Sequence, residues 1–148
     1  MSQGTQLVSS PTLAFTVHGT PAPAGSKKAV PMGKRWGVID DSKKSRPWKN
    51  LVAQHAGDAM AGRELLQGPL HLVLRFYVRR PKAHFGASGA IRPAAPRWPA
   101  QKPDATKLLR AVEDAMQGVV YRNDSQVVAQ FVTKEWGPER VEVEVREL

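Results

Sequence analysis

The sequence predicts an α+β fold in which a small mixed β-sheet carries two α-helices packed on one face. Apolar residues at a spacing of about 3.6 predict the two helices, and segments that alternate apolar with polar residues predict the strands around them. With 148 residues, the chain has the length of one domain that buries its own core. We therefore expect residues 12–148 to form a single domain and residues 1–11 to be a flexible lead.

Two strand regions precede the first helical pattern. Leu13–His18 (LAFTVH) predicts one strand, because it ends at Gly19 and at the PAPAG run of residues 21–25. Residues 27–40 then predict a short irregular hairpin, with the run Trp36–Ile39 as its second arm.

The first helix is expected to run from about Ser45 to Met60, with Asp41 or Ser42 as its N-cap. One face of this helix is apolar at helical spacing and consists of Trp48, Leu51, Val52, His55, Ala56 and Ala59. Gly62 and Gly68 bracket its end. The pattern indicates a helix that packs one side against the sheet.

The clearest strand is predicted at Leu70–Val78, because its apolar and partly polar positions alternate. Its core-facing side is expected to consist of Leu70, Leu72, Leu74, Phe76 and Val78. From Arg79 to Gln101 the composition changes to Arg, Lys, Pro, Ala and Gly, with the aromatic residues Phe85 and Trp98. A loop of this length in a small domain is usually functional or disordered.

A second helix follows this loop and is predicted by an apolar stripe. The stripe consists of Leu108, Ala111, Val112, Ala115 and Met116. The polar side of the same helix carries Thr106, Arg110, Glu113 and Gln117. Two strands are expected after it, at Gln126–Lys134 and Arg140–Leu148, joined around Gly137-Pro138.

The composition argues against several classes of protein. The chain has no run of about eighteen apolar residues, so we expect no transmembrane helix and no membrane partner. Its first residues, MSQGTQLVSSPT, lack the basic start and apolar segment of a secretory signal. It contains no Cys, which excludes disulfides and thiolate metal sites and agrees with a reducing compartment. We therefore expect a cytoplasmic protein.

The formal net charge of +9 is unevenly distributed along the chain. Residues 1–100 hold 15 Lys and Arg against 4 Asp and Glu, whereas residues 101–148 hold 7 against 9. The basic residues gather in two groups: Lys27, Lys28, Lys34, Arg35, Lys43, Lys44, Arg46 and Lys49, then Arg75, Arg79, Arg80 and Lys82. This split predicts a polyanion held by one region and an acidic site supplied by another. A solvated basic surface without a partner explains the charge equally well.

Three aspartates follow the basic part of the chain. Asp104 lies at the start of the second helix, Asp114 in its last turns, and Asp124 behind Asn123 before the next strand. Each has an ordinary structural role open to it: a helix cap, an ion pair with Arg110, or a turn. Together they predict a cation site, because Mg²⁺ usually takes one or two carboxylates with waters and phosphate. We therefore expect the three carboxylates to meet at one sheet edge, where a bound cation activates water against a phosphodiester.

The segment from Lys102 to Lys134, KPDATKLLRAVEDAMQGVVYRNDSQVVAQFVTK, resembles the RusA-type Holliday junction resolvases. Their signature reads roughly KPDxDNLxKxxxDAL…G…DDxQV…K. The runs GTPAPAGSKKAV and RRPKAHFG and the helix around Pro47-Trp48-Lys49 are similar to phage-type members. The resemblance implies a homodimeric, Mg²⁺-dependent endonuclease, with Mn²⁺ as a substitute. Such an enzyme nicks four-way (Holliday) DNA junctions symmetrically, in a bacterial or phage-infected cell.

The resemblance also implies roles for particular residues. The positions that match the family's motif are Asp104, Arg110, Asp114, Asp124, Gln126 and Lys134. It implies that Asp104 and Asp124 bind the metal, with Asp114 as a supporting ligand. Lys134 or Arg110 would stabilise charge on the phosphate during the reaction.

Two acidic positions of the family's pattern are neutral in this chain. The second Asp falls on Thr106 and its neighbouring Asn on Lys107, while the first member of the later Asp pair falls on Asn123. A lost carboxylate weakens a site for a hard cation, because the number of charges sets the affinity. Three explanations stay open: an active enzyme that recruits Asp114 or Glu113, a naturally inactive binder, or an artificially substituted sequence.

We expect a structure-selective DNA endonuclease that holds DNA backbones with Lys27, Lys28, Lys43, Lys44, Arg79, Arg80, Lys82, Lys102 and Lys107. Phe85 or Trp98 is expected to wedge against an unstacked base, or else to anchor the loop. The rival is a protein of the same fold that binds branched DNA without cutting it, which the missing carboxylate favours. A basic RNA- or ribosome-associated protein explains the charge but not the ordered aspartates.

Overall fold

The computed structural model describes residues 10–25, 27–40 and 43–148. Its centre is a four-stranded sheet with the strand order β1-β6-β4-β5. These strands are β1 (Leu13–His18), β4 (Leu70–Val78), β5 (Val127–Trp136) and β6 (Arg140–Glu147). β4 pairs parallel with β5 and antiparallel with β6, which in turn pairs antiparallel with β1. The sheet is therefore mixed, and β1 and β5 form its two edges.

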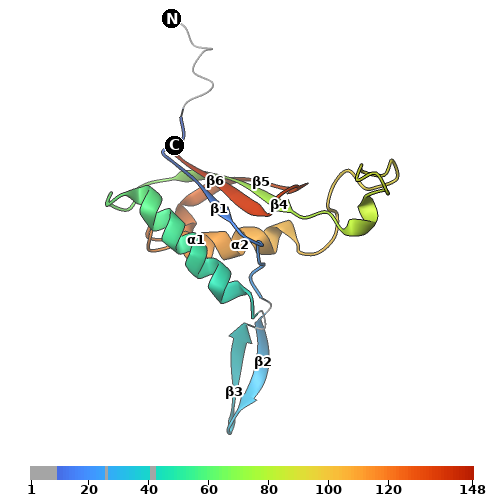
Figure 1. Ribbon diagram of the computed structural model, residues 1–148. Helices are drawn as coiled ribbons and strands as arrows, with labels where there is room; N and C mark the ends of the chain where they lie inside the picture. The colour runs from blue at the N-terminus through green and yellow to red at the C-terminus, as the bar shows by residue number, and fades with distance from the viewer. Residues whose placement is uncertain (1–9, 26, 41–42) are drawn as a thin grey trace, which may run out of the picture.

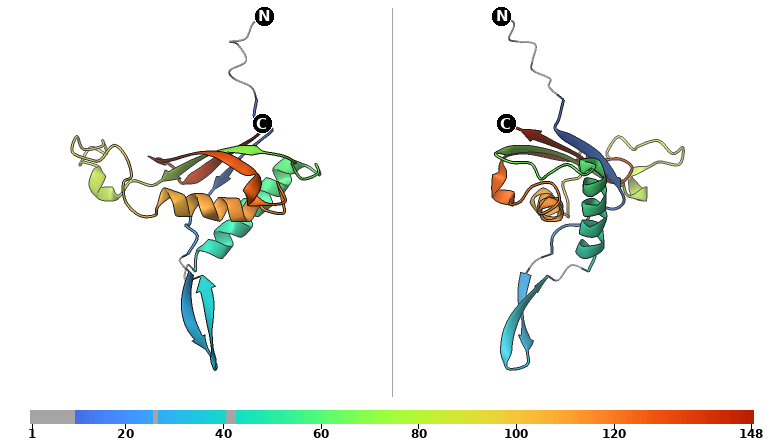
Figure 2. Two further views of the ribbon diagram at one scale, coloured as in Figure 1. Left: turned by 180° about the vertical axis from the view of Figure 1, so that it is seen from behind. Right: turned by 90° about the vertical axis from the view of Figure 1, so that its left-hand side faces the viewer.

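Two helices, α1 (Ser45–Met60) and α2 (Ala105–Met116), lie on the same face of this sheet (Figure 1). The two further views in Figure 2 show the sheet as one layer and both helices as the other. This arrangement confirms the expected α+β fold. The bounds of α1 agree with the sequence pattern. Asp41 and Ser42 lie outside the described residues, and Lys44, which precedes the helix, makes no capping hydrogen bond with its side chain.

The core lies between the sheet and the two helices. The sheet contributes the alternating positions of β4 and β6, all buried: Leu70, Leu72, Leu74, Phe76, Val141, Val143 and Val145. The helices contribute Trp48, Val52, Ala56, Met60, Leu108, Ala111, Val112 and Met116. Removing these side chains from water is the main stabilising contribution to the fold. Val78, expected to face the core as well, is only half-buried because it ends its strand.

The opposite face of the sheet carries charged residues instead of a helix. Glu144 on β6 pairs with Arg75 on β4 at 3.1 Å and with Arg146 at 2.8 Å. Arg140 pairs with Glu142 at 3.0 Å, and its guanidinium lies 3.6 Å from the centre of the Tyr77 ring. Half-exposed pairs of this kind add little stability individually. They keep this face polar, in agreement with the alternating pattern of both strands.

Residues 27–40 form the expected hairpin, but it is regular. β2 (Lys27–Met32) and β3 (Arg35–Asp40) pair antiparallel without a register shift, from Lys27 opposite Asp40 to Met32 opposite Arg35. Gly33 in the turn has a φ of +67°, a conformation that favours glycine. The hairpin projects away from the sheet beyond the start of α1 (Figures 1 and 2).

The long loop between β4 and α2 is held against the end of β5. It contains one turn of 3₁₀-helix, η2 (Lys82–His84). Both Arg80 and the indole N–H of Trp136 donate to the carbonyl of Pro96, at 2.9 and 3.1 Å. The Arg80 guanidinium also lies 5.1 Å from the Trp136 ring centre. The loop is therefore ordered by contacts that the sequence did not reveal.

The last two strands differ slightly from their expected bounds. β5 begins one residue late because a 3₁₀ turn, η3 (Asp124–Gln126), precedes it. It continues to Trp136, because Trp136 still pairs with Val78 of β4. Within the described parts of the chain, no helix is both long and apolar enough to cross a bilayer.

Candidate active site

α2 runs antiparallel to β5 beneath the edge of the sheet. Near the end of β5, the Lys134 ammonium donates to the carbonyls of Gln101 and Pro103, at 2.6 and 2.8 Å. Near the middle of the strand, the amide of Gln130 donates to the carboxylate of Glu113, in the last turn of α2. The start of α2 therefore lies at the end of β5, and the end of α2 lies towards the start of β5.

Asp104 occupies the N-cap position of α2. Its backbone is extended, and its carbonyl accepts the first helical hydrogen bond from Leu108 at 3.0 Å. Its carboxylate accepts no capping hydrogen bond and the residue is exposed. The ordinary structural explanation of this aspartate, a side-chain cap, therefore does not apply. A carboxylate here can bind a cation while it stays near the helix N-terminus, which favours negative charge.

A second group of carboxylates lies at the other end of α2. Burial raises the pKa of Glu113, and the nearby charges of Asp124 and Asp114 raise it further, while the hydrogen bond from Gln130 opposes the shift. Asp124 and Asp114 are thus close enough to Glu113 for their charges to act on it. Asp114 contacts the ammonium of Lys49 on α1 at 3.4 Å, so its ion pair is not with Arg110 as the helical spacing suggested.

The side-chain amides of Gln117, Asn123 and Gln126 make the hydrogen bonds that fix the turn carrying Asp124. The backbone N–H of Asp124 donates to Gln117 at 3.0 Å, and the side chain of Asn123 accepts from the N–H of Ser125 at 2.9 Å. Gln126 completes a capping box and donates to the carbonyls of residues 66 and 68 at 3.0 and 3.1 Å. Asn123 and Gln126 therefore shape the turn, a role that a neutral amide at position 123 serves well.

The single chain does not bring Asp104 to Asp114 and Asp124, contrary to the expectation that all three meet at one place. Ten residues of regular helix separate Asp104 from Asp114, a distance of about 15 Å along the axis. The sequence placed Asp104 at the start of the helix and Asp114 near its end, as the structure has them. A straight helix, however, keeps its two ends apart. In the described ranges, no cluster of three or more His, Cys, Asp or Glu side chains is arranged to hold a metal.

The donor chemistry nevertheless suits a hard cation. The candidate ligands are carboxylates, and Asp104, Asp114 and Asp124 are all exposed. Mg²⁺ prefers such oxygen ligands and keeps several waters. Thr106, the second residue of α2, is exposed and adds no negative charge to the candidate cation site. Arg110 is exposed midway along α2, one turn from Thr106 and one turn from Asp114, where it can reach a phosphate bound along this face.

The predicted DNA-binding residues fall into two described groups. Lys43, Lys44, Lys102 and Lys107 surround one cavity at the starts of α1 and α2. Arg79, Arg80 and Lys82 lie where β4 runs into the long loop, and Arg80 is engaged by Trp136 and Pro96. The side chains of Lys27 and Lys28 on β2 lie outside what the structure describes. Sequence reasoning missed Gln130 and Lys49 as partners of the acidic group, because both contacts join separate elements.

The structure is thus an α+β domain with exposed carboxylates along one helix and lysines around the start of that helix. The family model described as Endodeoxyribonuclease RusA matches residues 18–146, most of the chain. The chain therefore belongs to the RusA endodeoxyribonuclease family, which confirms the resemblance found in the sequence. Nucleases of this family act on branched DNA junctions and generally depend on a metal.

The chain is also similar to a bacterial protein over nearly its whole length. The chain is 31% identical over 150 residues to a protein of Bacillus subtilis (strain 168) that bears the name Uncharacterized protein YqaN. The match covers 92% of this chain and 96% of the relative.

Proposed function

We propose that this protein is a structure-selective, Mg²⁺-dependent endonuclease that cleaves four-way DNA junctions by hydrolysis of a phosphodiester bond. The observation that carries the proposal is Asp104, an exposed N-cap aspartate that caps nothing and lies beside a group of lysines. Membership of an endodeoxyribonuclease family supports it. The protein would act in the cytoplasm of a bacterial or phage-infected cell.

Asp104 and Asp124 would hold the cation, with Asp114 as a supporting ligand. When bound, Mg²⁺ or Mn²⁺ polarises the phosphate and lowers the pKa of an attacking water. Arg110 would contact the phosphate and stabilise its developing charge.

Lys134 would not contact the phosphate in this proposal. Its ammonium already donates to two carbonyls just before α2, so it positions the segment that carries Asp104.

A homodimer would bring the two ends of α2 together. The reason is that Asp104 and Asp124 lie about one helix length apart in a single chain, so a cation that binds both must take them from two subunits. Twofold dimers are the commonest protein assemblies. In such a dimer Asp104 would approach Asp124 of the partner subunit, and the same contact would recur at a second, equivalent site.

The edge strand β5 is the surface we propose for this dimer. It forms one edge of the sheet and carries two exposed apolar residues, Val128 at 62% and Phe131 at 52% exposure. An unpaired edge is a template for pairing with another chain. If two β5 strands pair antiparallel about a twofold axis, the start of one lies beside the end of the other. The start of β5 follows Asp124 and its end lies near Asp104, so this pairing joins the two acidic groups.

Lysines and arginines on the helix side would hold the DNA backbones. Lys43, Lys44, Lys102 and Lys107 surround the start of α2, and the projecting β2–β3 hairpin extends from the same region (Figure 1). Such contacts position DNA without reading its sequence. Of the two loop aromatics, Trp98 is the better candidate wedge because it is 53% exposed, whereas Phe85 is half-buried and pairs with Ile91.

The second candidate function is a binding protein of the same fold that does not cut. Thr106 favours it, because this exposed position in the first turn of α2 lacks the carboxylate of the family's pattern. A labelled four-way junction incubated with the protein and Mg²⁺ or Mn²⁺ separates the two. Symmetric nicks that EDTA prevents support the nuclease. Tight junction binding with no nicks in either metal supports the binding protein.

Junction binding is expected to be strongly dependent on salt. A dimer that neutralises several phosphates with each subunit should lose roughly 10³-fold or more in affinity between 50 and 200 mM salt. Fluorescence anisotropy with a labelled junction and a linear duplex of equal length, both without metal, measures this loss. A flat salt profile contradicts the proposed basic surface. Equal affinity for the two DNAs at physiological salt contradicts selectivity for branched DNA.

A further inference from the structure

We propose that a cavity beside Asp104 binds one unstacked nucleobase of the DNA strand whose backbone passes the acidic site. The proposal rests on the nuclease function proposed above and names a binding site that the function does not require. Three segments far apart in the sequence form the cavity: residues 19–23, residues 43–51 and residues 102–107. Its volume of about 770 Å³ is typical of pockets that hold small organic molecules and is ample for one nucleotide.

The floor of the cavity is apolar. Its side chains come from all three segments and include Pro21, Pro23, Pro47, Trp48, Leu51 and Pro103. Gly19 borders the indole of Trp48 and has a φ of +140°, a backbone conformation that favours glycine. Trp48 lies beneath this floor, because it is buried, and the partly exposed rings of Pro23, Pro47 and Pro103 offer rigid surfaces against which the face of a base can pack, with little side-chain entropy to lose.

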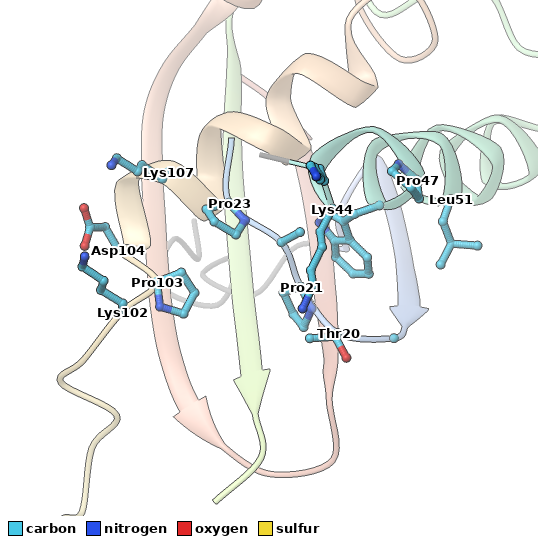
Figure 3. A pocket seen from close by; sticks show the side chains of 14 residues that line it. Thr20, Pro21, Pro23, Lys44, Pro47, Leu51, Lys102, Pro103, Asp104 and Lys107 are labelled. Atoms are coloured by element: carbon cyan, nitrogen blue, oxygen red, sulfur yellow. The ribbon is translucent and has the colours of Figure 1, made fainter. Parts of the chain in front are cut away.

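The rim of the cavity is cationic. Lys43, Lys44, Lys102 and Lys107 line it, against the single carboxylate of Asp104. Figure 3 shows Lys102, Asp104 and Lys107 at one end, Pro47 and Leu51 at the other, and Pro21, Pro23 and Pro103 between them. An apolar floor with ammonium groups at its edge matches a nucleotide, which joins a flat base to an anionic phosphate.

The position of Asp104 selects DNA as the source of this nucleotide. The same carboxylate lines the cavity and begins α2, where the proposed cation lies. A phosphate held at Asp104 therefore has its neighbouring nucleoside within reach of the floor. A base costs least to unstack where the duplex is already interrupted, as at the centre of an open branched junction.

Pro47→Glu tests the cavity directly, and Asn50→Glu is its matched control. Pro47 is exposed in the first turn of α1 and lines the cavity, whereas Asn50 is exposed on the same helix and does not line it. Each change lowers the net charge by one. Glu in the first turn is favourable for a helix that has no acidic residue there, so Pro47→Glu should fold. Circular dichroism and thermal melting check the fold of both variants.

The measured quantity is the affinity for a four-way junction without metal, determined by fluorescence anisotropy. A series of junctions is used, each lacking one base at a different position of one strand. We expect one strand position at which removal of the base weakens wild-type binding by about tenfold. Pro47→Glu should weaken binding of the unmodified junction by a similar factor and no longer respond to that abasic site. Asn50→Glu should behave as the wild type.

Two results would overturn the inference: no strand position at which the base matters, or an equal loss of affinity in both variants. If no base matters, the cavity does not bind a base. If both variants lose affinity equally, the effect of Pro47→Glu is that of an added negative charge and not of a blocked cavity. Because cleavage is not measured, a protein that binds junctions without cutting them gives the same abasic result. The failure of the nuclease proposal is therefore distinguishable from the failure of this one.

Discussion

Replacing either Asp104 or Asp124 by Asn is expected to abolish junction cleavage while junction binding stays intact or tightens. Each change removes a proposed cation ligand and also a negative charge that repels phosphate. The loss of rate should exceed the roughly 10–100-fold cost of losing a residue that merely orients a ligand. Gel assays of nicked junction in Mg²⁺ measure cleavage, and anisotropy without metal measures binding. If Asp104→Asn unfolds the protein, Asp104 is a structural residue and its assignment to the cation is wrong.

The same two variants test whether each site is shared between subunits. When differently tagged Asp104→Asn and Asp124→Asn chains are co-expressed and the mixed dimer is purified, one of its shared sites carries both changes and the other carries none. The mixed dimer should therefore recover nicking at one site, while both parent dimers stay inactive. A mixed dimer as inactive as its parents would show that Asp104 and Asp124 act within one subunit or on separate cations.

Thr106→Asp is expected to raise the rate of cleavage in Mg²⁺ and to lower the metal concentration that gives half the maximal rate. Thr106 is exposed in the first turn of α2, two residues after Asp104. Both carboxylates can reach a cation beyond the helix start, where the helix dipole also favours their charge. The gain should be at least as large as the effect of a residue that orients a ligand, roughly 10-fold or more.

Thr106→Asn is the matched control, because it adds a polar side chain of the same size without the charge. It should leave the rate and the metal requirement close to those of the wild type. If Thr106→Asp folds and binds junctions but shows no gain in cleavage, the rest of the site is not competent. That outcome supports the binding protein over the nuclease.

Much of the fold was predictable because its signals are local. The alternation of Leu70–Val78 and the 3.6-residue stripe of α2 each need only neighbouring residues to be recognised, and both elements form as expected. Gly19 and the proline-rich run after it marked the end of β1 for the same reason. The motif from Lys102 to Lys134 identified the family, since its order and spacing are properties of the chain itself.

The arrangement of the site depended on contacts between separate elements. The sequence located Asp104, Asp114 and Asp124, but the tertiary structure decided that a straight helix holds the first apart from the other two. It also decided that Asp114 pairs with Lys49 and that the ammonium of Lys134 turns to the carbonyls before α2. No periodicity encodes such contacts, because the partners lie tens of residues apart.

The sequence by itself therefore determined the α+β elements, the basic and acidic regions and the family. Only the tertiary structure decided which carboxylates are neighbours and that three distant segments enclose an apolar cavity with a lysine rim. The physical reason is the range of the interactions. Backbone hydrogen bonding and apolar periodicity act over a few residues, whereas charges and cavities are assembled by packing across the whole chain.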